Sequence, residues 1–410
     1  MLVVWVRTLL KGQKGRLGAL MAQVNWITFF SRAVGNLWET RQQGAEKLIF
    51  GLPLWEKPVL LHCWILTMKA FAITNPGQSE IQEIEKPDPK GDEALLRIHK
   101  VGFCGGDLNA YRGTFPMQQY PMIIGHEVGA TIEAVGQHVP DEFAVGTKVT
   151  LNPYQAGVDD TDDCLPCRRG LRNAAVDNRT MGVRRPGAMT DYITVPHQKL
   201  YRSDKLSHRE LALVEPLTVG FHATNRGQVA AGEFVMVFGC GIVGLGAVSG
   251  AAVKGANVIA VDIDDQKLEV AKKAGAKYTI NSLKDNLHNR QLEITNGDGP
   301  LVCIEAVGLP ATFRACVEEV AFTGRVVYIG YAKEMVEYDT KLFVQKELNV
   351  FGSRNALTEF HDVIAMLETG GKFPVEEVIS RTVRIDEAPR AMKDWAADPS
   401  KIIKMMLELD

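Results

Sequence analysis

A glycine-rich turn between two strand-like runs constrains the fold of this chain more than any other feature. The apolar run Phe234–Phe238 is typical of a buried strand, and a small-residue helix is expected from Ile242 to Lys254. A second apolar run, Val258–Val261, follows that helix. Three glycines spaced as G-x-G-x-x-G occupy the turn: Gly239, Gly241 and Gly244. This order predicts a βαβ unit of a parallel sheet.

Each glycine of the turn has a physical role in binding a dinucleotide. Gly239 permits the tight turn, Gly241 lets the backbone approach a pyrophosphate, and Gly244 lets the helix pack closely on the sheet. The phosphates are expected at the helix N-terminus, beside Ile242 and Val243. A βαβ unit that binds no ligand is the alternative, since glycines also mark ordinary loops.

An acidic residue at the end of the second strand favours the dinucleotide interpretation. Asp262 lies 23 residues after Gly239, close to the spacing at which a carboxylate accepts hydrogen bonds from the adenosine ribose. Its charge would repel a ribose phosphate, which favours NAD over NADP. Lys267, on the following helix, could also contact the ribose, but its charge does not outweigh the preference for NAD that Asp262 sets.

Zinc-ligand side chains lie upstream of the turn. Cys104, His126, Glu127 and Glu215 supply thiolate, imidazole and carboxylate groups. A catalytic zinc takes three such ligands and keeps one position open. Taken singly, a cysteine is usually a small buried hydrophobe and a histidine a hydrogen-bonded core residue. The order of these residues ahead of a dinucleotide turn predicts a metal that polarises an alcohol while a nicotinamide accepts its hydride.

Together these segments resemble a known family. The motifs are V-G-F-C-G-G-D at 101–107, G-H-E-V-G at 125–129, V-E-P-L at 214–217 and the glycine turn at 239–244. They are similar to the zinc-containing medium-chain alcohol and polyol dehydrogenases, particularly the sorbitol and sugar-acid dehydrogenase branch. The resemblance extends from about Met68 to the C-terminus. It implies a Rossmann cofactor domain, a doubly wound parallel sheet, inserted into a β-rich GroES-like substrate domain, in an α/β protein.

The resemblance also implies roles for individual residues. Cys104 and His126 correspond to fixed zinc ligands, and either Glu127 or Glu215 is the third, with the other holding the metal's water. Asp107 corresponds to a residue that orients His126; a turn or cap aspartate is the alternative. Arg354 lies near a basic substrate contact of polyol dehydrogenases, although a solvated arginine at a strand end fits equally well.

Two departures from the family pattern bear on function. Family members usually carry Ser or Thr two residues after the catalytic cysteine to pass the alcohol proton toward solvent, and this chain has Gly106. A water or one of the two glutamates could substitute. In the lobe from Ala156 to Asn178, the four cysteines around the family's structural zinc are reduced to two.

That lobe is therefore expected to lack a structural zinc and to be mobile. Cys164 and Cys167 remain, whereas Thr161 and Ala175 occupy the outer positions. Two thiolates do not close a tetrahedral site. A distorted site stays open as an alternative, because three carboxylates lie nearby: Asp162, Asp163 and Asp177.

Length and composition limit the remaining possibilities. A chain of 410 residues predicts more than one domain. A formal net charge of -3 offers no basic field for nucleic acid, and seven scattered cysteines do not suggest a secreted disulfide framework. We therefore expect a cytoplasmic protein without a nucleic-acid or membrane partner. The family resemblance implies a homodimer or homotetramer.

The first 67 residues differ from the rest of the chain. They hold five of its six tryptophans and few acids, and show no sustained periodicity. We interpret residues 1–67 as an unstructured extension or a start site assigned too far upstream, with Met68 as the natural first residue. The expected domains are then 68–221 and 355–410 for the substrate domain and 222–354 for the cofactor domain.

The predicted function is hydride transfer between a polyol, sugar acid or other secondary alcohol and NAD, with one catalytic zinc. A zinc enzyme of the threonine or glucose dehydrogenase type shares most of the motifs and is one alternative. A second is an NAD-binding pseudoenzyme that lost catalysis when Gly106 and the cysteine-depleted lobe arose. The presence of Cys104, His126, Glu127 and Glu215 together argues against it.

Overall fold

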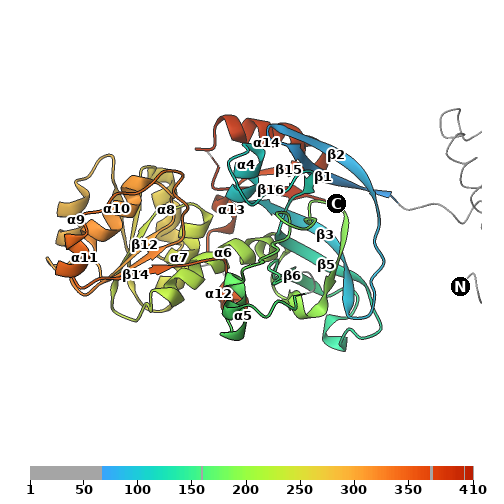
Figure 1. Ribbon diagram of the computed structural model, residues 1–410, viewed down its shortest axis with the longest axis horizontal. Helices are drawn as coiled ribbons and strands as arrows, with labels where there is room; N and C mark the ends of the chain where they lie inside the picture. The colour runs from blue at the N-terminus through green and yellow to red at the C-terminus, as the bar shows by residue number, and fades with distance from the viewer. Residues whose placement is uncertain (1–66, 158–159, 370–372, 401, 410) are drawn as a thin grey trace, which may run out of the picture. The chain divides into compact units, whose positions relative to one another are not determined.

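The computed structural model describes residues 67–157, 160–369, 373–400 and 402–409 (Figure 1). The predictions made for residues 1–66 lie outside the described residues. Thr67 begins the first described strand, β1 (Thr67–Asn75).

A six-stranded, fully parallel sheet forms the cofactor part of the molecule, in the order β11-β10-β9-β12-β13-β14. Chain order reverses between the neighbours β9 and β12, which is the switch point where doubly wound sheets bind dinucleotides. The strands are β9 (Phe234–Phe238), β10 (Asn257–Asp262), β11 (Tyr278–Asn281), β12 (Val302–Glu305), β13 (Arg325–Tyr328) and β14 (Asn349–Gly352).

Helices cover both faces of this sheet because its strands are apolar on both sides. Along β9, Val235 and Val237 point into one hydrophobic core, and Met236 and Phe238 point into another. The predicted doubly wound architecture is confirmed (Figure 1). The connecting helices are α7 (Ile242–Val253), α8 (Asp265–Lys273), α9 (Leu287–Ile294), α10 (Pro310–Glu319) and α11 (Lys341–Gln345).

The β-rich part contains a seven-stranded sheet and a three-stranded sheet. In the larger one the path is β15-β16-β3-β5-β6-β8 with β7 paired to β3, and in the smaller one it is β2-β1-β4. The strands are β2 (Gln78–Glu85), β3 (Glu93–Phe103), β4 (Met122–Ile123), β5 (Glu127–Val135), β6 (Lys148–Leu151), β7 (Tyr192–Pro196), β8 (Leu200–Arg202), β15 (Ile379–Arg384) and β16 (Lys404–Glu408).

The C-terminal segment completes the larger β-rich sheet. Strand β16 pairs antiparallel with β3, so Met405 lies opposite Phe103. The cofactor part is therefore inserted between two segments that share one sheet, as expected. Helices α12 (Phe360–Glu368), α13 (Val375–Val378) and α14 (Ala388–Ala397) lie in the C-terminal segment.

One long helix, α6 (His208–Arg226), was not predicted from the sequence. Ser207 and Glu210 form a capping box at its start, a signal that the sequence pattern S-x-x-E could have revealed. Pro216 lies inside the helix. Because α6 continues past residue 221, it crosses the expected boundary between the domains, and the domain limits stay predictions. No helix among the described residues has both the length and the apolarity to cross a membrane.

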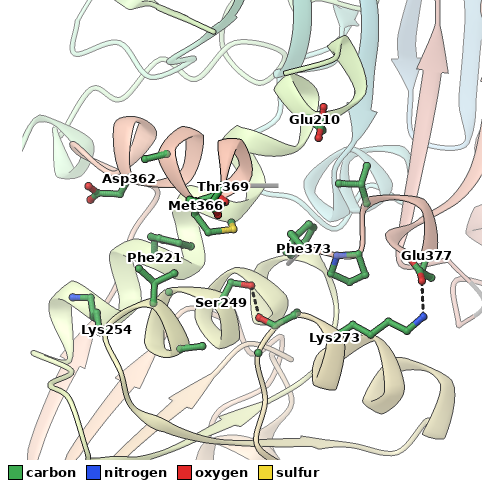
Figure 2. A pocket seen from close by; sticks show the side chains of 18 of the residues that line it. Glu210, Phe221, Ser249, Lys254, Lys273, Asp362, Met366, Thr369, Phe373 and Glu377 are labelled. Atoms are coloured by element: carbon green, nitrogen blue, oxygen red, sulfur yellow. Dashed lines mark hydrogen bonds and ion pairs between the residues drawn. The ribbon is translucent and has the colours of Figure 1, made fainter. Parts of the chain in front are cut away.

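A hollow of about 1510 Å³ lies between α6, α7, α12 and α13, and none of Cys104, His126, Glu127 or the glycine turn lines it (Figure 2). Its polar side chains join neighbouring elements: Ser249 donates to the Ala274 carbonyl at 3.0 Å, and Lys273 pairs with Glu377 at 2.5 Å. These contacts indicate a structural role.

Candidate active site

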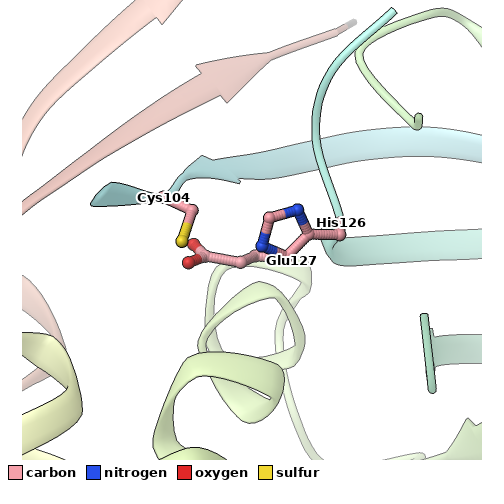
Figure 3. Close-up of side chains that lie close together, drawn as sticks. All are labelled: Cys104, His126 and Glu127. Atoms are coloured by element: carbon pink, nitrogen blue, oxygen red, sulfur yellow. The ribbon is translucent and has the colours of Figure 1, made fainter. Parts of the chain in front are cut away.

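Strand pairing brings three predicted zinc ligands together. Cys104 follows the end of β3, whereas His126 and Glu127 lie at the start of β5. The two strands pair antiparallel with Gly102 opposite Glu127, so the ends that carry these side chains meet. The thiol, imidazole and carboxylate ligand atoms all lie within 4.8 Å of one another (Figure 3).

The donor set fits a zinc ion. His126 and Glu127 are buried, and Figure 3 shows one ring nitrogen of His126 turned toward Cys104 and Glu127. Burial lowers the pKa of His126, yet the hydrogen bond and charge of Cys104, followed by the charges of Glu215 and Asp107, hold it well above its usual range. Negative charge is therefore concentrated around one buried imidazole, and a bound cation would balance it.

A buried lysine holds the carboxylate of Glu127. Lys404 Nζ lies 2.6 Å from both Glu127 carboxylate oxygens and donates to the Phe103 carbonyl at 3.0 Å. The Lys404 and Glu127 side chains are each 1% exposed. A buried charge needs such a partner, so β16 contributes the counter-charge of this site.

The second predicted glutamate lies in the same cavity. Glu215, on α6, is 4% exposed and accepts a hydrogen bond from the Tyr154 hydroxyl. Burial raises the pKa of Glu215; the charge of Glu127 adds to this rise, while His126 and Tyr154 oppose it. Glu215 does not belong to the compact triad of donors that includes Glu127.

The side chain of Asp107 has a different contact from the one predicted. Its carboxylate accepts the backbone N–H of Cys104 at 2.9 Å and closes a capping box at the start of α4 (Gly105–Tyr111). Among the described residues it forms no hydrogen bond with His126, whose buried Nδ1 has no partner. The cap alternative describes the observed contact, because the N3 position of a short helix brings a carboxylate back to the N-cap N–H.

One cavity of about 890 Å³ connects the metal-type cluster with the glycine turn. Cys104, His126 and Glu127 line one part of it, and Ile242 and Val243, at the start of α7, line another. Strand-end residues of the cofactor sheet, including Ala306 and Gly330, complete the wall, as does Arg354. The structure thus brings the predicted ligands and the predicted cofactor turn to a single space. Arg354 Nη1 also donates to the Ala175 carbonyl at 3.4 Å.

The glycine turn has the predicted geometry. Gly239 has a φ of +94°, and a Cβ on Gly244 would lie 1.9 Å from the Gly239 carbonyl oxygen. A Cβ on Gly241 would meet nothing within 4 Å, which leaves space where a pyrophosphate is expected. Asp262 accepts the backbone N–H of Cys240 at 2.7 Å, and Lys267 is half-buried on α8.

Sequence reasoning missed several polar residues that line this cavity, and five of them lie near the two glutamates or the lobe. Lys404 and Tyr154 contact the two glutamates directly, as described above. The other three lie on the segment that follows the lobe or at its edge: Asn178, Thr180 and Arg184. Lys404 is the first residue of β16 and precedes the apolar run Met405–Leu407, and no local pattern marks its contact with Glu127.

Comparisons with known proteins agree with the site. The family profile of the zinc-binding dehydrogenases matches residues 243–369, and that of the alcohol dehydrogenase GroES-like domain matches residues 90–205. The chain is 32% identical over 339 residues to an uncharacterized zinc-type alcohol dehydrogenase-like protein of Haemophilus influenzae, covering 82% of this chain and 98% of that protein.

Two further relatives have more specific descriptions. L-galactonate-5-dehydrogenase of Escherichia coli is 30% identical over 317 residues, which cover 77% of this chain and 91% of the relative. A crystal structure of an Escherichia coli alcohol dehydrogenase complexed with NADH superimposes with a TM-score of 0.76 at 30% identity. That match covers 84% of this chain and 99% of the other.

Proposed function

The chain belongs to the zinc-type alcohol dehydrogenase family, and from that premise we propose that it transfers hydride between a secondary alcohol and NAD. One observation carries the proposal. The cavity that holds Cys104, His126 and Glu127 also reaches the start of α7 beside the glycine turn. An alcohol oxygen at the metal and a nicotinamide ring would therefore share one cleft, as direct hydride transfer requires.

Cys104, His126 and Glu127 would hold the zinc, which supplies Lewis-acid polarisation of the substrate oxygen when bound. Their ligand atoms form the compact triad, and Lys404 fixes the orientation of the Glu127 carboxylate. Glu215, which accepts a hydrogen bond from Tyr154 and lines the same cavity, would then be the glutamate that holds the metal's water. Zinc content of Glu127→Gln and Glu215→Gln tests this assignment: the first should lose zinc and the second should retain it.

The carboxylate of Glu215 also provides a route for the alcohol proton. Gly106 carries no hydroxyl, but Glu215 lines the same cavity and the Tyr154 hydroxyl lies against it. A general base within hydrogen-bond reach of the reacting hydroxyl performs this step. Glu215→Gln should therefore lower kcat while leaving the KM for NAD unchanged.

Basic side chains favour an anionic polyol derivative as the substrate. Apart from Lys404, which pairs with Glu127, the charged residues that line the cavity away from the metal cluster are Arg184, Lys333 and Arg354. Arginine is well suited to bind a carboxylate or phosphate. The relative described as L-galactonate-5-dehydrogenase acts on such a sugar acid. We therefore place sugar acids ahead of neutral polyols.

The choice of NAD rests on Asp262. Its carboxylate lies at the end of β10 with both oxygens engaged by backbone N–H groups, including those of Cys240 and Ile263. In this position the Asp262 carboxylate would accept hydrogen bonds from the ribose hydroxyls of NAD. Its negative charge would repel the ribose phosphate of NADP. Asp262→Ser should reduce the preference for NAD by about tenfold or more, measured as the ratio of kcat/KM values.

The decisive experiment measures zinc content beside NAD-linked oxidation of a panel of secondary alcohols. The panel contains neutral polyols, aldonic acids, threonine and glucose. One catalytic zinc with turnover of a polyol or sugar acid supports the proposal. Preferred turnover of threonine or glucose would favour the alternative branch. NAD binding without turnover of any member would indicate a pseudoenzyme. Sedimentation of the same material tests the expected dimer or tetramer.

A further inference from the structure

A second group of metal-type side chains lies in the lobe, residues 156–178. Cys164 and Cys167 enclose the sequence C-L-P-C, and Cys164 is the N-cap of α5 (Leu165–Arg168). Their sulfur atoms lie 3.2 Å apart, in direct contact. Both cysteines are free and partly exposed, unlike the buried Cys303 and Cys316 of the cofactor part.

This group does not fit a closed structural zinc. A carboxylate oxygen of Asp162 lies within 4.8 Å of both sulfurs, which gives three donors. No fourth His, Cys, Asp or Glu joins them within the described part of the chain. A structural zinc takes four ligands. The outer positions of the family pattern are Thr161, which is exposed, and Ala175, which is fully buried.

We propose instead that Cys164 and Cys167 form a reversible dithiol–disulfide pair whose oxidant is a small disulfide of the glutathione class. Thr161 and Ala175, at the outer positions of the family pattern, offer no thiol, and the sulfurs of Cys164 and Cys167 are already in contact. Closing the bond joins residues three apart in one turn and leaves the rest of the lobe's chain path unchanged. The site goes beyond the hydride-transfer function and does not depend on it.

The chemistry balances as two thiol–disulfide exchanges. One protein thiolate attacks glutathione disulfide, forms a mixed disulfide and releases the first glutathione thiolate. The second cysteine then attacks the protein sulfur of that mixed disulfide and releases the second glutathione. Two protein thiols are oxidised to one disulfide, and one glutathione disulfide is reduced to two glutathione thiols. The two thiol protons pass to the departing glutathione.

Thiol mapping of the full-length, zinc-loaded protein tests the proposal. The protein is equilibrated in buffers of increasing oxidised-to-reduced glutathione ratio, quenched with acid and alkylated. The tryptic peptide 149–168 contains Cys164 and Cys167 and no other cysteine. It should lose two hydrogen atoms and escape alkylation as the ratio rises. Cys240, Cys303 and Cys316 are buried, so they should stay reduced and serve as internal controls.

Single variants make the outcome decisive. Cys167→Ser and Cys164→Ser should each accumulate a glutathione adduct on the remaining cysteine, because neither variant can close the disulfide. The proposal is overturned if peptide 149–168 of the wild type remains fully alkylated at every ratio. It is also overturned if the reduced wild type holds a second zinc per chain that Cys164→Ser loses, because the three donors would then be a metal site.

Discussion

Two regions of this molecule each gather three metal-type donors within 4.8 Å, but their construction differs. In the cluster of Cys104, His126 and Glu127, Cys104 follows the end of β3 and lies 22 positions before His126, which immediately precedes β5. In the lobe, Asp162, Cys164 and Cys167 lie within one short stretch of chain. The sheet positions the first set, whereas local turns position the second.

The two clusters also differ in what surrounds their donors. Lys404 and Tyr154, from distant segments, fix the two glutamates of the catalytic cavity. In the lobe, Asp162 contacts its own neighbour, accepting the Cys164 N–H at 3.1 Å. Outer partners set the orientation and affinity of metal ligands. The number of donors alone therefore does not define a catalytic metal site, because the residues that support the donors also determine it.

Substitution of one cysteine in each cluster should distinguish the two clusters directly. Cys104→Ser should lose the catalytic zinc and lower kcat/KM at least about 10³-fold, since Lewis-acid stabilisation contributes several kcal/mol. Cys164→Ser, assayed under reducing conditions, should stay within about twofold of the wild type, as expected for a substitution away from the reacting groups. Metal analysis and steady-state kinetics measure both. Normal zinc and turnover in Cys104→Ser would contradict the assignment.

The second prediction tests whether Lys404 stabilises the buried carboxylate of Glu127. Lys404→Met leaves the Glu127 carboxylate buried without its partner, which should lower the free energy of unfolding of the metal-free protein by about 3 kcal/mol. Urea denaturation measures this change. The double variant Lys404→Met/Glu127→Gln is the control: it should regain most of the stability, because no unpaired charge remains, but not the activity. Equal stabilities of the single and double variants would show that the ion pair does not stabilise the fold.

Much of the fold and of the candidate site could be predicted from the sequence, but only where the signal is local. Runs such as Phe234–Phe238 are apolar on both faces and predict a buried parallel strand, and the spacing of Gly239, Gly241 and Gly244 predicts the phosphate turn. Cys104 and His126 were found through their motifs. Lys404 was not, because its partner is 277 residues away and only the pairing of β16 with β3 brings them together.

The same limit explains why the capping contact of Asp107 and the helix α6 were not predicted. A motif shows that an aspartate lies three residues after Cys104, but whether it turns toward His126 or the Cys104 N–H depends on the cap geometry of α4. Helix α6 is difficult to predict from the sequence because it contains Pro216, and a proline normally argues against a helix interior. Tertiary contacts with α7 outweigh that local cost.

A third prediction concerns how the lobe is anchored to the rest of the molecule. His222 Nδ1 contacts Glu359 at 2.8 Å, and His222 Nε2 lies 3.2 Å from Asn173 of the lobe. Burial would raise the pKa of Glu359, yet its hydrogen bonds to His222 and neighbouring groups lower it to about 2 from 4.5. A lowered folded-state pKa stabilises the protein above the unfolded value and loses this contribution as pH falls toward 2.

Glu359→Gln should therefore lower the free energy of unfolding by about 2 kcal/mol at pH 7. The difference from the wild type should shrink between pH 4.5 and about 2, the interval given by the two pKa values. Denaturant unfolding at a series of pH values measures both trends. Zinc content should not change. A stability difference that is constant across this interval would show that the ionised carboxylate is not the stabilising form.

The last prediction concerns Asn173, which connects the lobe to the cavity that holds Cys104. Its side chain is buried and donates to the Arg354 carbonyl at 2.8 Å, so it connects the lobe to a residue that lines the catalytic cavity. Asn173→Ala removes the contacts of this side chain with the Arg354 carbonyl and with His222 Nε2. The hydrogen bond to Arg354 is worth about 1 kcal/mol, and its loss should raise the KM for a sugar acid about fivefold. A neutral polyol provides the matched control, because it does not need the Arg354 charge. Its KM should change less, with the KM for NAD and the zinc content unaltered. An equal rise for both substrates would mean that the lobe shapes the cavity generally, without acting through Arg354.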